Sequence, residues 1–303
     1  MRVSRIAWAA ALGLLLLPAC KTLEDLGDLG ASVGEATGTV SSEQAESIRK
    51  SSAALAKTFE DITPEQEYYI GRTVGATVIK AYPVYDDPKA TAYLNRLGQS
   101  LARFSDKPET FAGYHFLVID TDEVNAFAAP GGFIFISRGM IRLCSNEDEL
   151  AAVLAHEIGH VQLQHGLQAI EKGRLSSALN VLAMEGAKSF GGKELAELTD
   201  AFEDSITDIT STMMNSGYAR EAEREADQAA VVILERAGYN PRGLTGMLAQ
   251  MDQEVEPGDL GFGKTHPDPA DRIDDLRNRV ERHPRIASPS ERQKRFKAAV
   301  SGV

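Results

Sequence analysis

The pentapeptide His156-Glu157-Ile158-Gly159-His160 constrains this chain more than any other stretch, because it sets two imidazoles at a defined spacing. The segment reads as helix, and residues four apart on a helix project from one face, about one turn apart. Two neutral imidazole nitrogens in this arrangement can hold one zinc ion. Glu157 lies beside the pair, close enough to reach a metal-bound water without being a ligand. The spacing therefore favours a zinc-dependent peptidase.

The residues around the pentapeptide separate this interpretation from an accidental match, in which both His would be ordinary helix-surface groups. Ser145 and Asn146 are good N-cap residues, and the acidic run 147–149 suits the positive end of a helix. Apolar residues at helical spacing form a stripe beside the His face: Leu150, Val153, Leu154, Ile158 and Val161. A helix buried on one side, with His-Glu-His next to that side, is more typical of a metal site than of a solvated surface.

Composition narrows the possible partners. The 303 residues carry a formal net charge of -12 and no basic cluster, so we expect no nucleic-acid partner and no charge-driven binding to anionic lipid. The only cysteines are Cys20 and Cys144, which encode no disulfide framework. Cys144 follows an apolar residue and precedes the helix cap, and we expect it to act as a small buried hydrophobe.

The first twenty residues have the pattern of an export signal. Arg2 and Arg5 precede an apolar run over residues 6–17 that is too short to span a bilayer comfortably. Leu17-Pro18-Ala19-Cys20 resembles a bacterial lipobox, in which the Cys carries lipid, although Pro18 departs from the usual pattern. We therefore expect a lipoprotein-type signal over 1–19 and a membrane anchor through lipid on Cys20. An ordinary cleaved signal is the alternative.

Composition shifts divide the remaining chain. Residues 20–60 are rich in small and acidic residues and are expected to be a flexible tether. A folded domain is expected over 61–285, opening with helices near 63–82 and 88–101, and residues 286–303 are expected to be a C-terminal tail. No stretch after the signal is apolar enough to cross a membrane. The order of elements predicts an α+β, mostly helical fold with a small sheet beside the His-Glu-x-x-His helix.

Two short stretches rich in β-branched and aromatic residues, 115–120 and 132–137, predict the strands of that sheet. Val124–Ala128, between them, is predicted to be a further short strand. In zinc peptidases an edge strand beside the metal commonly binds the polypeptide substrate as an added strand. Val124–Ala128 is our candidate for that role, and an ordinary edge strand is the alternative.

Catalytic zinc usually takes three protein ligands, and spacing after His160 tests where the third lies. A metzincin would place His at position 166, which is Gly166 here, and we read His165 as a surface residue. A thermolysin-like chain would place Glu near position 180, which is Asn180, and Glu185 lacks supporting context. Residues 167–216 read as two or three helices that form either scaffold or a cover over the cleft.

A better candidate for the third zinc ligand lies farther along the chain. Residues 218–227 read as a helix that carries Glu223 and Asp227 on one face. Such a pair can supply one metal-binding carboxylate and one carboxylate that orients a ligand His through its other nitrogen. Spacing alone leaves a solvated charged helix as the stronger reading, because acidic and basic residues alternate along this segment.

Three motifs carry a resemblance to a known family. Arg220-x-x-Glu223-x-x-Ala226-Asp227, downstream of His156-Glu157-x-x-His160, resembles the signature of the gluzincin metallopeptidases that include HtpX, BepA and the CAAX prenyl proteases. Ala219 replaces the family's usual Ser or Thr. The segments 125–132 and Thr265-His266-Pro267-x-x-x-x-Arg272 are also similar to family motifs. The resemblance covers about residues 63–282, without the membrane helices or helical repeats of those relatives, so prenylated substrates are not expected.

The resemblance implies roles for six residues. His156, His160 and Glu223 would bind one Zn²⁺, and Glu157 would be the general base. Asp227 would support the ligands, and His266 would lie near the metal, either stabilising the transition state or acting as a fourth, regulatory ligand.

The expected function is a zinc metalloendopeptidase of the bacterial cell envelope, facing the periplasm and anchored in the outer membrane, that cleaves misfolded or unassembled envelope proteins. The alternative is a periplasmic chaperone or assembly factor for outer-membrane proteins with latent protease activity. A structural zinc protein is a weaker alternative, because a closed four-ligand site is not evident unless His266 completes it.

Overall fold

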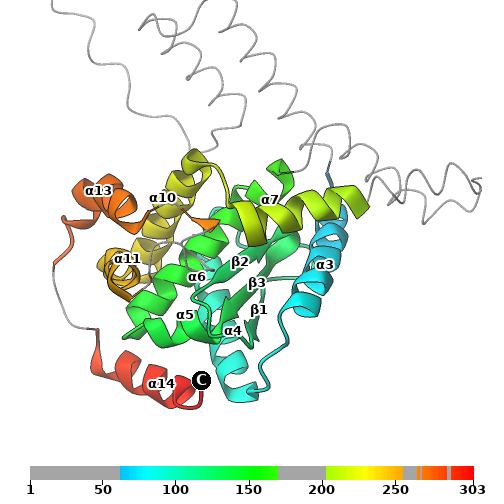
Figure 1. Ribbon diagram of the computed structural model, residues 1–303. Coiled ribbons are helices and arrows are strands. Elements are labelled where there is room, and N and C mark those ends of the chain that lie inside the picture. Colours follow the sequence, from blue (N-terminus) through cyan, green and yellow to red (C-terminus); the bar gives the residue numbers. More distant parts are fainter. Residues whose placement is uncertain (1–61, 170–202, 255–264, 267, 285–287) are drawn as a thin grey trace, which may run out of the picture. The chain divides into compact units, whose positions relative to one another are not determined.

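The computed structural model describes residues 62–169, 203–254, 265–266, 268–284 and 288–303, which belong to one compact unit, Ile62–Val303 (Figure 1). The expected signal, the expected tether and most of the segment 167–216, with Asn180 and Glu185, lie outside the described residues. Within the described ranges, no helix has both the length and the apolar character that a membrane span requires.

Three strands form the sheet. They are β1 (His115–Ile119), β2 (Ala126–Ala129) and β3 (Phe133–Ser137), in the order β1-β3-β2. β3 runs parallel to β1 and antiparallel to β2, with Phe127 opposite Phe135. All three lie at or within two residues of the stretches predicted from β-branched and aromatic content, and β2 is an edge strand, as expected.

Two N-terminal helices support the sheet. α3 (Pro64–Ala81) begins with a complete capping box between Thr63 and Gln66, and α4 (Pro88–Ala102) is capped by Asp87. α3 packs against the 3-10 turn η1 (Pro130–Gly132) that joins β2 to β3, and α4 packs against β1. The ends of both helices follow the local cap and proline signals, which predicted them from sequence.

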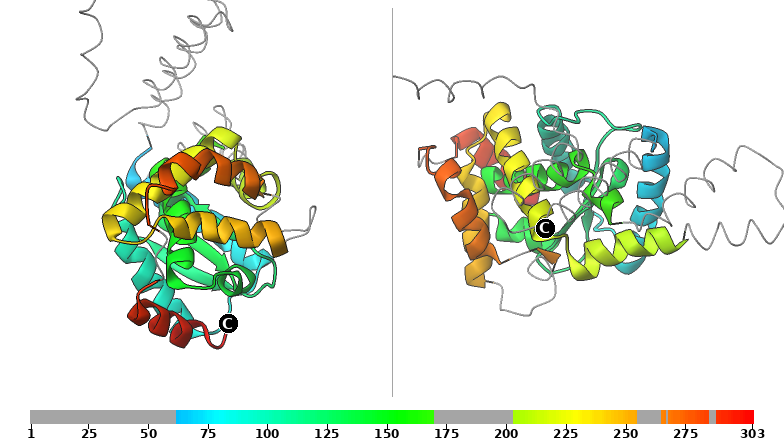
Figure 2. Two further views of the ribbon diagram at one scale, coloured as in Figure 1. Left: turned by 90° about the vertical axis from the view of Figure 1, so that its left-hand side faces the viewer. Right: turned by 90° about the horizontal axis from the view of Figure 1, so that it is seen from above.

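The centre of the fold is α6 (Glu147–Gln162), which contains the His-Glu-x-x-His pentapeptide. Every residue from Glu147 to Val161 is buried, so the expectation of a helix buried on one side only is wrong. One side of α6 packs against β2 and the other against α10 (Arg220–Ala237) and α11 (Arg242–Glu254). Figure 2 shows α10, α11 and α13 (Pro269–Val280) stacked together on that side. The small residues Ala151, Ala152, Ala155 and Gly159 allow this close approach.

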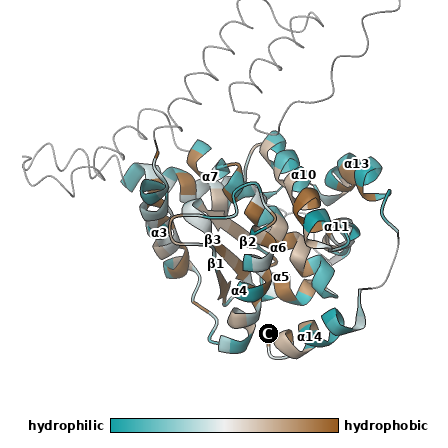
Figure 3. Cartoon of the chain, turned by 180° about the vertical axis from the view of Figure 1, so that it is seen from behind, coloured by the Kyte–Doolittle hydropathy of each residue, from teal (hydrophilic) through white to brown (hydrophobic). Residues whose placement is uncertain are grey.

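The hydropathy of each element agrees with its place in the interior or at the periphery of the fold. In Figure 3 the strands are coloured mostly hydrophobic, whereas α13 and the last helix, α14 (Ser290–Val300), are coloured mostly hydrophilic. The contiguous core includes Leu94, Ile134, Leu154 and Leu234 from four different elements. Cys144, between the short helix α5 (Arg138–Leu143) and α6, is buried and unpaired, as expected for a small hydrophobe.

The C-terminal residues depart from the expected tail. α14 packs against α4 and α6, with Phe296 and Ala299 buried in the core. Arg295 forms an ion pair with the fully buried carboxylate of Glu147, which also accepts hydrogen bonds from two tyrosines. Residues 290–300 therefore belong to the folded unit, because buried apolar side chains and a paired buried charge hold them there.

Candidate metal centre

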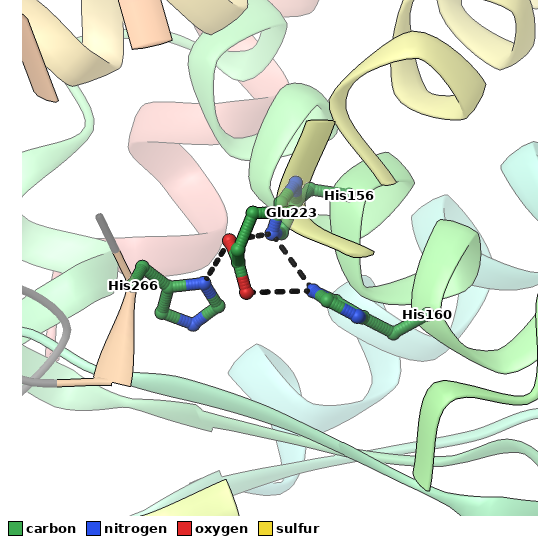
Figure 4. Close-up of side chains that lie close together, drawn as sticks. All are labelled: His156, His160, Glu223 and His266. Atoms are coloured by element: carbon green, nitrogen blue, oxygen red, sulfur yellow. Dashed lines mark hydrogen bonds and ion pairs between the residues drawn. The ribbon is translucent and has the colours of Figure 1, made fainter. Parts of the chain in front are cut away.

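Four side chains from three separate segments meet beside α6. His156 and His160 come from α6, Glu223 from the first turn of α10, and His266 from the segment before α13. One potential ligand atom of each lies within 4.8 Å of the others. Figure 4 shows the Glu223 carboxylate between the His266 ring and the pair of α6 imidazoles. The tertiary fold thus brings together residues separated by as many as 110 positions.

The distances within the cluster suit a shared cation. The Nε2 atoms of His156 and His160 lie 3.1 Å apart. Glu223 Oε2 lies 2.6 Å from His266 Nδ1 and 3.5 Å from His156 Nε2, and Glu223 Oε1 lies 3.5 Å from His160 Nε2. Two imidazoles and a carboxylate are the donor set of many catalytic zinc sites, so the residues present fit this ion.

Burial and neighbouring groups shift the pKa values of these side chains. Burial raises the pKa of Glu223, but the charges and hydrogen bonds of His266 and His156 outweigh it and hold that pKa well below its ordinary value. Burial also holds the pKa of His160 well below its usual range. An ionised Glu223 and a neutral His160 are the forms that bind a cation.

Glu157 faces the cluster without taking part in it. Its side chain is buried, and its Oε1 atom has no hydrogen-bond partner among the described residues. Burial raises the pKa of Glu157 to about 7. Glu157 lines a narrow cavity together with His266, Tyr218 and the β2 residues Phe127 and Ala128. A buried carboxylate with an unsatisfied oxygen, next to a metal-ligand cluster, is well placed to accept a proton from water.

Asp227 lies one helical turn after Glu223 and contacts the other side of His156. Its Oδ1 atom is 2.9 Å from His156 Nδ1, which leaves His156 Nε2 directed into the cluster. Arg272 of α13 donates two hydrogen bonds to the same carboxylate and lowers the pKa of Asp227, which burial alone would raise, to about 2. The structure therefore places Asp227 where a carboxylate orients a ligand His.

His165 was read from sequence as a surface residue, and that reading is wrong. Gln164 adopts φ 57°, which ends the helical path and directs His165 of α7 (His165–Gln168) back toward α6. His165 is 1% exposed, and its Nδ1 atom lies 2.9 Å from His160 Nδ1. Helical periodicity could not predict this position, because it assumes that the helix continues.

Sequence patterns assigned no role to two further residues near the cluster, Tyr218 and Arg272. The Tyr218 ring stacks on His160 with centroids 4.5 Å apart, and its hydroxyl lies 3.5 Å from the Ala128 carbonyl oxygen. Arg272 stood in a recognised motif, but without a role. For Tyr218 the only local signal is its position immediately before the helix that carries Glu223.

The profile of Peptidase family M48 matches residues 88–280. The chain belongs to this family. Its M48 domain thus contains the pentapeptide, Glu223, Asp227 and the segment around His266. The resemblance to gluzincin metallopeptidases is confirmed, as is the mostly helical fold with a small sheet.

Several relatives are named proteases. The chain is 30% identical over 230 residues to the beta-barrel assembly-enhancing protease of Escherichia coli K12, covering 74% of this chain and 45% of the relative. It is 27% identical over 228 residues to the mitochondrial metalloendopeptidase OMA1 of Schizosaccharomyces pombe, covering 72% and 62%. It is 26% identical over 205 residues to the E. coli metalloprotease LoiP, covering 68% and 74%. The chain thus spans about half the length of the assembly-enhancing proteases that it matches.

Proposed function

We propose that this chain is a zinc metalloendopeptidase in which His156, His160 and Glu223 bind one Zn²⁺ and Glu157 is the general base. The observation that carries the proposal is the buried four-donor cluster with the unsatisfied Glu157 carboxylate beside it. Membership of the M48 family supports the same chemistry. A closed structural site would have no use for a buried carboxylate oxygen without a hydrogen-bond partner at this position, which makes the structural-zinc alternative weaker.

In the proposed mechanism, His156, His160 and Glu223 would hold the zinc ion, which would supply Lewis-acid chemistry to the scissile carbonyl and the attacking water. Glu157 accepts the proton of the attacking water and returns it to the leaving amine. Burial, which raises the pKa of Glu157, favours its acceptance of the proton. General acid–base help of this kind contributes roughly 10²–10⁴ in rate. Asp227 holds His156 so that its Nε2 atom faces the metal.

The proposed substrate is a polypeptide that binds as an added strand along Val124–Ala128. Support comes from β2, which covers Ala126–Ala129 at the edge of the sheet and lies against α6. Ala126, Phe127 and Ala128 line the same cavity as Glu157. A peptide paired with this edge would therefore have its main chain beside the proposed base.

We propose that the protein is located in the bacterial cell envelope, faces the periplasm and is anchored in the outer membrane by lipid on Cys20. Residues 1–19 would be the signal, residues 20–60 a tether, and the peptidase domain would begin at residue 61. The lipobox-like sequence and the resemblance to the assembly-enhancing protease support it. Misfolded or unassembled envelope proteins are the proposed substrates. Mass spectrometry of the mature N-terminus tests the anchor, since a lipidated Cys20 is expected in the parent and no lipid in Cys20→Ser.

The proposed activity is tested with the variant Glu157→Gln. It should keep stoichiometric zinc and lose cleavage of an unfolded protein such as casein. His160→Ala should lose the zinc itself, as measured by metal analysis. Cleavage by Glu157→Gln at the parent rate would overturn the assignment of the base.

A periplasmic assembly factor with latent protease activity is the second candidate. Its support is His266, whose Nδ1 atom lies 2.6 Å from Glu223 and which completes a four-donor set. A fourth protein ligand would take the position that catalytic zinc keeps open for water. His266→Ala should raise casein cleavage well above the parent if His266 is inhibitory, and lower it if His266 stabilises the transition state. Absence of cleavage in both proteins would favour the binding function.

A further inference from the structure

The turn after α6 has a backbone feature that calls for explanation. Gln164, with φ 57°, is the only non-glycine with positive φ in the described parts of the chain. A side chain in this left-handed region costs roughly 1–2 kcal/mol, and such residues persist where the surrounding structure holds them in place. The result of the turn is that His165, the next residue, lies buried against His160 instead of continuing along the helix surface.

His165 links a proposed zinc ligand to a carboxylate near the surface. His160 Nδ1 lies 2.9 Å from His165 Nδ1, and His165 Nε2 lies 3.2 Å from Glu225 Oε2. The Glu225 side chain is 31% exposed, whereas that of His165 is 1% exposed. The three groups form a continuous hydrogen-bonded chain from the metal cluster on α6 to the outer side of α10.

The three hydrogen-bonded groups His160, His165 and Glu225 allow one arrangement of protons when zinc is bound. His160 Nε2 faces the cluster and must be unprotonated to bind a metal, so the proton of the neutral ring is on Nδ1. His160 Nδ1 then donates to His165 Nδ1, which must be an acceptor. A neutral His165 therefore carries its proton on Nε2 and donates it to Glu225. Each partner sets the tautomer of the next.

The other proposed ligand on α6, His156, is oriented directly by a carboxylate. His156 Nδ1 lies 2.9 Å from the buried carboxylate of Asp227, which is paired with Arg272. His160 has no carboxylate at this distance on its Nδ1 side among the described residues, and His165 occupies that position. The two ligands are thus oriented by different devices, one direct and one through an intervening imidazole.

We propose that His165 and Glu225 are positioning residues that hold His160 as an Nε2 ligand of the metal. The proposal rests on the proposed zinc site and adds a support for it beyond the three motifs that carry the family resemblance. Burial of the His165 imidazole carries a desolvation cost that an apolar side chain of the same size would not have. The hydrogen bonds of His165 to His160 and Glu225 offset this cost and orient His160.

The test is zinc affinity, measured by competition with a chromophoric chelator, in two substitutions of His165. His165→Phe keeps a planar ring and removes the acceptor, and should weaken zinc binding about 10–100-fold. His165→Asn can place its amide oxygen near the position of Nδ1 and should stay within about threefold of the parent. Glu225→Gln should fall between them. Absorption of the Co²⁺-loaded proteins should show an altered ligand field for His165→Phe and a parent-like one for His165→Asn.

His283 provides the matched control, because it also contacts a glutamate of α10. Its Nε2 atom lies 3.0 Å from Glu235, away from the metal cluster. His283→Phe should leave zinc affinity and the Co²⁺ spectrum unchanged. Zinc affinity of His165→Phe within about twofold of the parent, or an equal loss in His165→Asn, would overturn the positioning role. A parent protein that binds no zinc would instead overturn the proposed function.

Discussion

The guanidinium of Arg272 donates two hydrogen bonds, of 2.6 and 2.9 Å, to the carboxylate of Asp227, and both side chains are buried. Arg272 belongs to α13 and Asp227 to α10, so this ion pair joins two helices immediately behind the metal cluster. The same carboxylate contacts His156 Nδ1. The orientation of a proposed zinc ligand therefore depends on a helix that contributes no ligand of its own.

Removal of Arg272 should destabilise the fold as well as the site. Arg272→Ala leaves the buried Asp227 charge without its guanidinium partner and with only the His156 imidazole beside it, and breaking a buried pair in this way costs about 3–5 kcal/mol. Urea unfolding of the metal-free protein measures this cost. Arg224→Ala is the control, because the Arg224–Asp275 pair joins the same two helices but is exposed and should contribute little. Similar losses in both variants would contradict the special role of the buried pair.

Chelation of zinc should lower the thermal stability of the parent. A ligand that binds only the folded state stabilises it by mass action, about 2.7 kcal/mol when its free concentration is 100 times Kd. The unfolding temperature should fall when a strong chelator is added and recover on addition of excess Zn²⁺. His160→Ala should show neither response. A parent whose unfolding temperature is insensitive to chelator would argue against a bound metal.

Gly217 should tolerate no side chain. Its φ is 74°, and a Cβ atom there would lie 2.0 Å from the carbonyl oxygen of Thr265, the residue before His266. Gly217→Ala should therefore displace His266 in addition to straining the backbone. Gly238→Ala measures the cost of the milder left-handed conformation alone, because Gly238 has φ 75° and ψ 20° with open space around it, and should cost only about 1–2 kcal/mol. Gly217 has ψ 172°, a conformation that is essentially restricted to glycine, so the displacement of His266 is read from zinc affinity and not from stability. Equal unfolding free energies and equal zinc affinities in the two variants would refute the steric contact.

The hydrogen bond between Tyr239, which follows α10, and Glu147 of α6 should weaken at alkaline pH. The Tyr239 hydroxyl donates to Glu147 at 2.8 Å, and burial together with that carboxylate raises the pKa of Tyr239 from 10.0 to about 12. Because the folded state favours the neutral phenol, this contribution to stability is present below about pH 10 and is lost as the pH rises toward 12. The unfolding free energy of the parent should fall more steeply across this window than that of Tyr239→Phe.

Local rules were sufficient for most of the elements. The capping box at Thr63, the N-cap at Asn146 and the β-branched stretches act over a few residues, so sequence reasoning placed α3, the start of α6 and the three strands close to their observed positions. The same rules misjudged α14, because its burial depends on Phe296 reaching the distant helices α4 and α6. Nothing within the segment itself reports that contact.

The sequence by itself determined that two imidazoles share one face of a helix, because helical spacing is a local property of the backbone. On spacing alone, Glu223 and Asp227 would have remained part of a solvated charged helix; only their resemblance to a family motif distinguished them. Tertiary structure brings Glu223 and His266, which the resemblance implied, into one cluster with the α6 imidazoles. Tertiary structure alone decided that Arg272 pairs with Asp227 behind His156 and that His165 and Glu225 lie behind His160. The physical reason is that these contacts depend on how α6, α10 and the α13 segment pack, and on one left-handed residue at the end of α6 that no helical pattern predicts.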